Sequence, residues 1–346
     1  MTIALLIIAL ISVAASGLLY HACSRLEESS HRLAARYGIP DIVKGSVITA
    51  ISSSLPEFAT AVLAIPVHDD FELGLSAIIG SAIFNVLVIP ACSVFARGDS
   101  LPANRDLVFR EAQFYLISVT ALLLVISLSV VYNSAAPGSG SEPIFGQLTR
   151  PLALLLISLY GLYLFIQYEE VRDHRQQTPR DVSVDAPKEW RTLIGCIALI
   201  LVGVELLLRC AIELGKLLET PTFLWGLTLV AAATSIPDTF ISVRAAREGR
   251  SESSTSNVLG SNVFDLLVAV PAGVLVAGTV SVNFTQTVPM MGFLMIATIV
   301  VLAFMRRDMK ISHSEAVSMM ALYVGFGLWM TAEAFGLTNL LGLPPP

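Results

Sequence analysis

The chain has 346 residues, of which 55% are hydrophobic and only 14% are charged, and its mean hydropathy is +0.74. Soluble domains carry about 25% charged residues, so this composition excludes an ordinary soluble protein and indicates a polytopic helical membrane protein. The net charge of −6 lacks the basic footprint of a nucleic-acid-binding protein. The four cysteines show no Cys-X-X-Cys spacing, which favours free buried thiols over a disulfide or a metal cluster.

Nearly charge-free stretches recur along the chain, each long enough to cross a bilayer core of about 30 Å as a helix. In chain order the predicted spans lie near residues 2–23, 38–66, 73–96, 112–134, 150–168, 191–215, 222–247, 255–277, 287–305 and 314–334. The first lacks the basic region of a cleaved signal peptide, so we interpret it as a retained span. A Ser/Thr-Pro break interrupts the second and the seventh spans, which are therefore predicted to be broken helices.

The basic residues predict the orientation, because short cytoplasmic loops collect Lys and Arg. Eighteen of the 21 basic residues lie in or beside alternate loops, those that follow the first, third, fifth, seventh and ninth spans. We therefore predict a protein of the plasma (inner) membrane with both termini outside and the charged linker 169–190 in the cytoplasm.

The chain also repeats internally, since residues 45–93 resemble residues 226–273. The matching residues are Gly45, Ala50, Ser54, Pro56 and Glu57 with Gly226, Ala231, Ser235, Pro237 and Asp238, and then Gly80, Ser81, Phe84 and Asn85 with Gly260, Ser261, Phe264 and Asp265. The turn inside the first copy is acidic and the turn inside the second is flanked by arginines, so the copies are predicted to face opposite ways. This organisation divides the chain into five-helix halves at 1–168 and 191–346. Inverted repeats with broken helices are typical of secondary transporters with a site near the midplane.

Three carboxylates of the two repeat copies lie deep inside predicted spans, where an ionisable group costs about 3 kcal/mol or more. They are Glu57, Asp238 and Asp265, and Asn85 holds the place in the first copy that Asp265 holds in the second. Such groups usually face a polar cavity and serve function, although a single one could be a packed, protonated residue.

Each central carboxylate follows a proline, which cannot donate a backbone hydrogen bond and frees carbonyls one turn earlier. Hydroxyls gather at these breaks, from Ser53, Ser54, Thr234 and Ser235. The i, i+4 spacing of Ser81 and Asn85, and of Ser261 and Asp265, places each pair on one helical face. Gly80 and Gly260 favour close helix packing. The candidate ligands are all oxygen atoms, which suits Ca²⁺, Na⁺ or K⁺ better than Zn²⁺ or Cu⁺.

These motifs resemble the alpha-repeats of the calcium/cation antiporter superfamily, the sodium/calcium exchangers. The second copy, Ser235-Ile236-Pro237-Asp238 followed by Gly260-Ser261-Asn262-Val263-Phe264-Asp265, is most similar to the potassium-dependent branch. The resemblance implies the sodium/calcium exchanger fold, ten helices in two inverted halves. It implies that Glu57 and Asp238 are the central ion ligands, flanked by Asn85, Asp265, Ser81 and Ser261. Ser53, Ser54, Thr234 and Ser235 would add hydroxyls or carbonyls, with the carbonyls of Ala50 and Ala231 nearby. The first copy departs from the family pattern at Ser53 and Ala82.

The expected function is therefore antiport of Ca²⁺ for Na⁺ by alternating access, without a prosthetic group; whether K⁺ moves with Ca²⁺ is left open. The partners would be inorganic cations and the lipid bilayer, with no nucleic acid and no protein partner evident. One alternative is a cation/H⁺ antiporter with the same site, since carboxylates in a cavity can titrate. An intramembrane aspartyl protease is disfavoured because the sequence lacks Gly-X-Gly-Asp settings, and we expect no enzyme activity. A channel is disfavoured because the buried carboxylates form no repeated pore ring.

Overall fold

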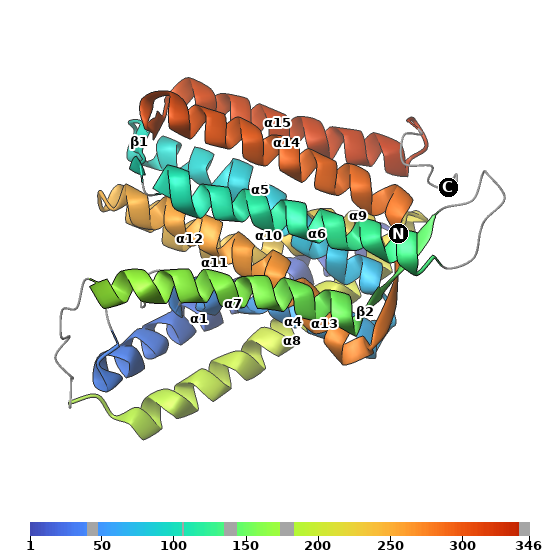
Figure 1. Ribbon diagram of the computed structural model, residues 1–346. Helices are drawn as coiled ribbons and strands as arrows, with labels where there is room; N and C mark the ends of the chain where they lie inside the picture. Colours follow the sequence, from blue (N-terminus) through green and yellow to red (C-terminus); the bar gives the residue numbers. More distant parts are fainter. Residues whose placement is uncertain (40–47, 106, 135–143, 174–182, 339–346) are drawn as a thin grey trace.

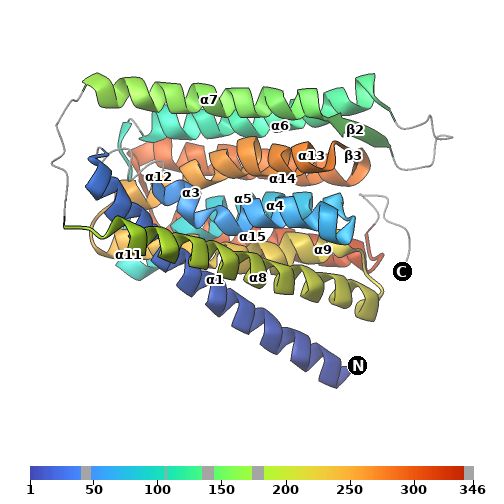
Figure 2. The ribbon, with the colours of Figure 1, turned by 90° about the horizontal axis from the view of Figure 1, so that it is seen from below.

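The structure, a computed structural model, describes residues 1–39, 48–105, 107–134, 144–173 and 183–338. Long helices run side by side through the molecule, and short strands lie only at the two ends of the bundle (Figure 1; Figure 2).

The elements follow in chain order. The helices are α1 (Thr2–Tyr37), α3 (Thr49–Ser53), α4 (Leu55–His68), α5 (Phe71–Arg97), α6 (Ala112–Tyr132), α7 (Arg150–Asp173), α8 (Ala186–Leu218), α9 (Thr222–Trp225), α10 (Ala231–Thr234), α11 (Ile236–Arg247), α12 (Ser251–Phe264), α13 (Val270–Ala277), α14 (Phe284–Asp308) and α15 (His313–Ala334). The π-helical segments that lie wholly within the described residues continue these helices: η2 (Leu107–Glu111), η3 (Gly226–Val230) and η4 (Asp265–Ala269). The strands are β1 (Leu101–Pro102), β2 (Phe145–Thr149), β3 (Thr279–Asn283) and β4 (Lys310–Ile311).

Within the described residues, eight continuous helical runs are long and apolar enough to cross a membrane, and a pair bent by 43° at its break, Thr222–Thr234 with Ile236–Arg247, makes a ninth. These nine coincide with nine of the predicted spans. The remaining prediction, 38–66, falls partly on residues 40–47, outside the described residues, and its described part forms α3 and α4. The all-helical polytopic fold is therefore confirmed.

Two helices extend well past their predicted spans. Helix α1 continues through Arg25 and Arg32, which we expected in a loop, and ends only at Gly38 in a left-handed conformation. This stretch is rich in helix formers, and an i, i+4 ion pair between Arg32 and Glu28 supports it. Helix α8 begins at Ala186, inside the predicted linker, where Asp185 caps it by accepting a hydrogen bond from the Lys188 amide at 3.4 Å.

Two pairs of short strands, absent from the sequence prediction, connect the halves. Strand β1, which follows α5, pairs antiparallel with β4, which precedes α15. Strand β3, which follows α13, pairs in the same way with β2, which precedes α7. The two pairs lie at opposite ends of the bundle (Figure 1). Equivalent segments of the two halves therefore end at opposite faces, so the repeats are inverted as predicted.

Helix α5 and the run α12–α13 form the centre of the bundle. In the most apolar 18-residue stretch of each, 83% of the residues are buried, whereas only 22% are buried in the corresponding stretch of α1. Helices α1 and α8 lie beside each other on one side of this centre, with exposed apolar side chains such as Leu10 and Val202 that suit contact with lipid (Figure 2). Helix α1 begins and α15 ends at the same end of the bundle, and α7 ends and α8 begins at the other (Figure 2). This arrangement agrees with termini on one face.

Candidate ion-binding site

The two broken spans have the same local structure. The first break lies at Ser54, between α3 and α4, and the second at Ser235, between α10 and α11. Proline occupies the second position of each following helix, where its missing N–H leaves no helical hydrogen bond unmade. Glu57 and Asp238 therefore lie in the first turn of α4 and α11, where the positive end of the helix dipole favours a carboxylate.

Each central carboxylate accepts a hydrogen bond from the serine of the neighbouring central helix. The Ser81 hydroxyl donates to Glu57 Oε1 at 3.0 Å, and the Ser261 hydroxyl donates to Asp238 Oδ2 at 2.6 Å. All four side chains are buried. The match between Glu57 and Asp238 that the sequence repeat predicted therefore extends to their hydrogen-bond partners.

The same two serines join the halves to each other. The Ser54 hydroxyl lies 2.5 Å from that of Ser261, and the Ser235 hydroxyl lies 2.8 Å from that of Ser81. Ser54 and Ser235 are equivalent positions of the two copies, and so are Ser81 and Ser261. The contact between Ser54 and Ser261 is therefore the counterpart of the contact between Ser235 and Ser81. These two contacts form a pseudo-two-fold arrangement around which the carboxylates lie.

Additional polar groups surround Asp238, the central carboxylate of the second copy. The Asn85 amide donates to Asp238 Oδ2 at 3.3 Å and to Asn262 Oδ1 at 3.0 Å, and the Asn257 amide lies 3.5 Å from Asp238 Oδ1. In the first copy Ala77 stands at the place of Asn257, and the site around Glu57 is accordingly less polar. The site is therefore asymmetric, with more amide groups around Asp238.

Several buried oxygen atoms of this region have no hydrogen-bond partner among the residues that the structure describes. They are Glu57 Oε2, Asn85 Oδ1, Asn257 Oδ1 and both carboxylate oxygens of Asp265. Unpaired buried acceptors are costly, so each needs a physical reason. All five are hard oxygen acceptors, the atoms that Ca²⁺ and Na⁺ prefer.

All twelve residues of the predicted site are buried, and all lie on α3–α5 or on the run from α10 to η4. The carbonyls of Ala50 and Ala231, expected to be near the ion, accept hydrogen bonds from Ser53 and Thr234, each at 3.2 Å. Their role as ion ligands stays a prediction. Among the described residues no three His, Cys, Asp or Glu side chains come close enough to hold one metal ion. The carboxylates would therefore share an ion with hydroxyl and amide oxygens.

Sequence reasoning missed two members of this network, Asn257 and Asn262. Asn257, Ser261 and Asp265 are spaced i, i+4 and i+8, which places them on one stripe of a helix. That spacing is a signal from which Asn257 could have been found. Asn262 lies beside the stripe, and its contact with Asn85 depends on how the two central helices meet.

A further intramembrane carboxylate, Glu205, has a different environment. Its side chain accepts a hydrogen bond from Arg209 at 2.7 Å and forms an i, i+4 ion pair with it. His68, at the end of α4, also lies 3.0 Å from Glu205 and connects α4 to α8. Glu205 is paired, unlike the second oxygen of Glu57.

This fold and site define a class of protein: a secondary cation transporter built from two inverted repeats, not an enzyme. Residues 3–169 and 188–332 match the family described as sodium/calcium exchanger protein, and the chain belongs to that family.

The relatives agree on the fold and differ in their ions. The sodium/calcium exchanger MaX1 of Methanosarcina acetivorans is 24% identical over 330 residues, covering 86% of this chain and 91% of MaX1. The solved sodium-calcium exchanger NCX_Mj superimposes with a TM-score of 0.61 at 22% identity, covering 92% of this chain and 97% of that one. The solved H⁺/Ca²⁺ exchanger CAX superimposes with a TM-score of 0.69 at 13% identity, covering 97% of this chain and 92% of that one. These likenesses show a cation exchanger fold without showing which ion is coupled.

Proposed function

We propose that this protein exchanges Ca²⁺ for Na⁺ across the membrane, and that Glu57 and Asp238 bind the two ions in turn. The observation that carries the proposal is the set of unpaired buried oxygens between the repeats, headed by Glu57 Oε2 and the Asp265 carboxylate. A cation would satisfy these atoms and offset the cost of burying carboxylates. Similarity to the sodium/calcium exchanger MaX1 supports Na⁺ as the coupling ion.

Exchange at such a site needs no covalent chemistry. The negative charge of Glu57 and Asp238 is costly in the membrane unless cations balance it. The protein would therefore change the face to which the site opens only when cations occupy the site. Ca²⁺ and Na⁺ compete for the same oxygens, so release of one must precede binding of the other. The broken helices α3–α4 and α10–α11 would carry the ligands, and movement of α1 and α8 against them would alternate the access.

The basic residues support an orientation in a plasma membrane with the arginine-bearing face in the cytoplasm. Arg32, Arg97 and Arg250 lie near the helix ends of that face. We therefore propose that the ends of α1 and α15 that carry the termini lie outside. Tagging the N-terminus and testing its accessibility in intact cells would check the orientation, and a shielded N-terminus would contradict it.

The deciding experiment is uptake of radioactive Ca²⁺ into proteoliposomes under an imposed Na⁺ gradient. We expect uptake that depends on the gradient and disappears when Na⁺ is equal on both sides. Empty liposomes and an ionophore that collapses the gradient are the controls. A purified, folded protein without gradient-dependent uptake would contradict the proposal.

Asp265 is expected to set the ion preference, because it adds a third carboxylate where the first copy has Asn85. A full charge on all three carboxylates would be balanced by Ca²⁺ together with one monovalent ion. The resemblance of the second copy to the potassium-dependent branch makes K⁺ the candidate for that ion. We expect K⁺ to stimulate uptake by the natural chain, and Asp265→Asn to remove this stimulation while Na⁺-dependent uptake persists. Uptake measured with and without K⁺ checks both. Stimulation that is unchanged in Asp265→Asn would contradict the assignment.

A second candidate is exchange of Ca²⁺ for H⁺, which the fold likeness to CAX favours. Buried carboxylates can exchange protons instead of Na⁺. A pH gradient imposed in the absence of Na⁺ distinguishes the two. Uptake driven equally well by the pH gradient alone would show that H⁺ is the coupling ion instead of Na⁺. The assignment of the ion-binding residues would not change.

A further inference from the structure

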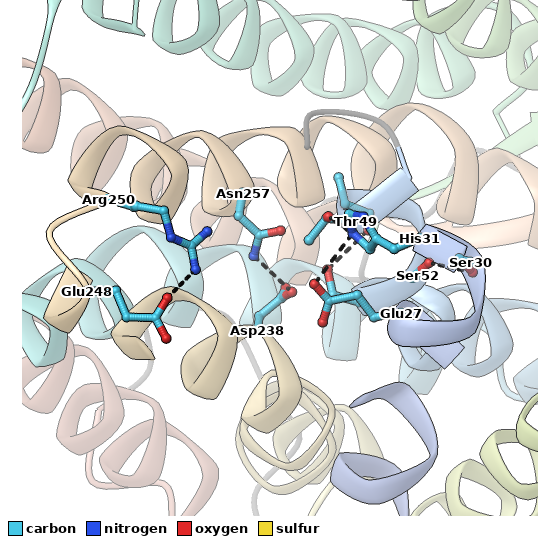
Figure 3. Close-up of polar contacts among 11 residues, drawn as sticks. Glu27, Ser30, His31, Thr49, Ser52, Asp238, Glu248, Arg250 and Asn257 are labelled. Atoms are coloured by element: carbon cyan, nitrogen blue, oxygen red, sulfur yellow. Dashed lines mark hydrogen bonds and ion pairs between the residues drawn. The ribbon is translucent and has the colours of Figure 1, made fainter. Parts of the chain in front are cut away.

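A cavity of about 840 Å³ leads from the arginine-bearing face toward the site. Its wall includes Glu27 and His31 of α1, Thr49 of α3, and Asn257 of α12. Asn257 is the residue whose amide lies 3.5 Å from Asp238 Oδ1, so the cavity ends one side chain away from the second central carboxylate (Figure 3).

The inner end of the cavity presents an unpaired acceptor. Asn257 is 4% exposed, its Oδ1 has no hydrogen-bond partner, and in Figure 3 this oxygen points away from Asp238 toward the side of Thr49 and His31. A buried amide oxygen turned into a polar cavity is a suitable ligand for a hard cation.

The charges along the wall single out Glu27. Arg32 is bound by Glu28 and by Glu189, the latter at 3.2 Å. Arg244 and Arg250, which also line the cavity, are both bound by Glu248.

The ion-pair partner of Glu27 is His31, whose Nε2 lies 3.8 Å from Glu27 Oε1 and 2.9 Å from the Thr49 hydroxyl (Figure 3). His31 is charged only when it is protonated. Glu27 is thus a carboxylate of this wall that no arginine binds within ion-pair distance in the described residues.

The geometry points to Glu27 as a recruiting carboxylate for the transported cation, which it would attract into this cavity and pass by way of Thr49 and the Asn257 oxygen to Asp238. This inference rests on the proposed function. A carboxylate in a cleft with low-dielectric protein walls raises the local concentration of cations and so acts on the apparent affinity rather than on the maximal rate. Its effect is confined to the face on which the cavity opens.

The first test measures Ca²⁺ transport separately from the two faces. We expect Glu27→Gln to raise KM for Ca²⁺ about three- to tenfold from the arginine-bearing face, to leave KM from the other face unchanged, and to leave the maximal rate unchanged. The difference should shrink at high ionic strength, because salt screens the carboxylate. The matched control is Glu28→Gln, the adjacent cavity residue that Arg32 already binds. An equal change from both faces, no change, or the same change in Glu28→Gln would overturn the inference.

A second readout does not depend on exchange. Ser253 lines the cavity and is exposed, four residues before Asn257. In a variant with its four cysteines replaced and Ser253→Cys added, a cationic thiol reagent should react faster than an anionic one of similar size. Glu27→Gln should lower this ratio about threefold, and Glu28→Gln should leave it unchanged. A ratio that Glu27→Gln does not alter would overturn the role of Glu27 even if exchange is observed, whereas loss of exchange with the ratio as expected would count against the proposed function alone.

Discussion

Replacement of Glu57 by Gln, or of Asp238 by Asn, is expected to reduce exchange to the background rate of empty liposomes. Each amide keeps the size of the side chain and can still accept the hydrogen bond from Ser81 or Ser261. The variant loses the charge that balances a cation in a buried site, and an interaction with a buried charge is typically worth several kcal/mol. A loss of about 3 kcal/mol would weaken cation binding more than 100-fold.

The measurement is Na⁺-gradient-driven Ca²⁺ uptake, with thermal stability in detergent measured in parallel to show that the variants fold. Glu111→Gln is the matched control, because Glu111 is a buried carboxylate bound by Tyr163 at 3.0 Å and by Gln167 at 2.7 Å. We expect this control to keep its exchange activity. Folded Glu57→Gln or Asp238→Asn protein with normal exchange would refute the assignment of the site.

Gly80→Ala is expected to destabilise the centre of the bundle and lower the melting temperature of the protein. A methyl group at this position of α5 would lie 2.3 Å from the Leu227 carbonyl oxygen and 2.8 Å from the Ala231 side chain. The first of these is a backbone atom of η3 and cannot move as a side chain can. Overpacking of this kind costs about 1–3 kcal/mol and sometimes more, and we expect the upper part of that range because the obstacle is backbone.

The measurement is the melting temperature of the purified protein in detergent, together with the yield of monodisperse protein. Gly161→Ala is the control, since a methyl group there meets no atom within 4 Å. In the middle of α7 it should leave stability unchanged or raise it by up to about 1 kcal/mol. Equal melting temperatures for the two variants would show that α5 and η3 can separate without cost.

Most of the fold follows from local chemistry, and therefore the sequence predicted it. Span length depends on the thickness of the bilayer, and the breaks depend on Pro56 and Pro237, so both are readable from neighbouring residues. Helix ends were less predictable. Helix α1 runs past Arg25 because a charged segment can stay helical outside the hydrocarbon core, where composition no longer marks the span.

The two short strand pairs could not be predicted because each joins segments from different halves. Leu101 pairs with Ile311, and Gly146 with Val282. Strands of two to five residues carry little pattern of their own, and their pairing is decided only when the halves have packed.

For the site, the sequence by itself determined the carboxylates, the hydroxyls and the inverted relation of the two copies. Each of these depends on residue type, on spacing within one helix, or on the charge of a loop. Only the tertiary structure decided which groups meet. Ser54 contacts Ser261, Asn257 joins Asp238, and one oxygen of Glu57 stays unpaired. The physical reason is that a hydrogen bond between residues 207 positions apart depends on the packing of whole helices, which no local pattern specifies.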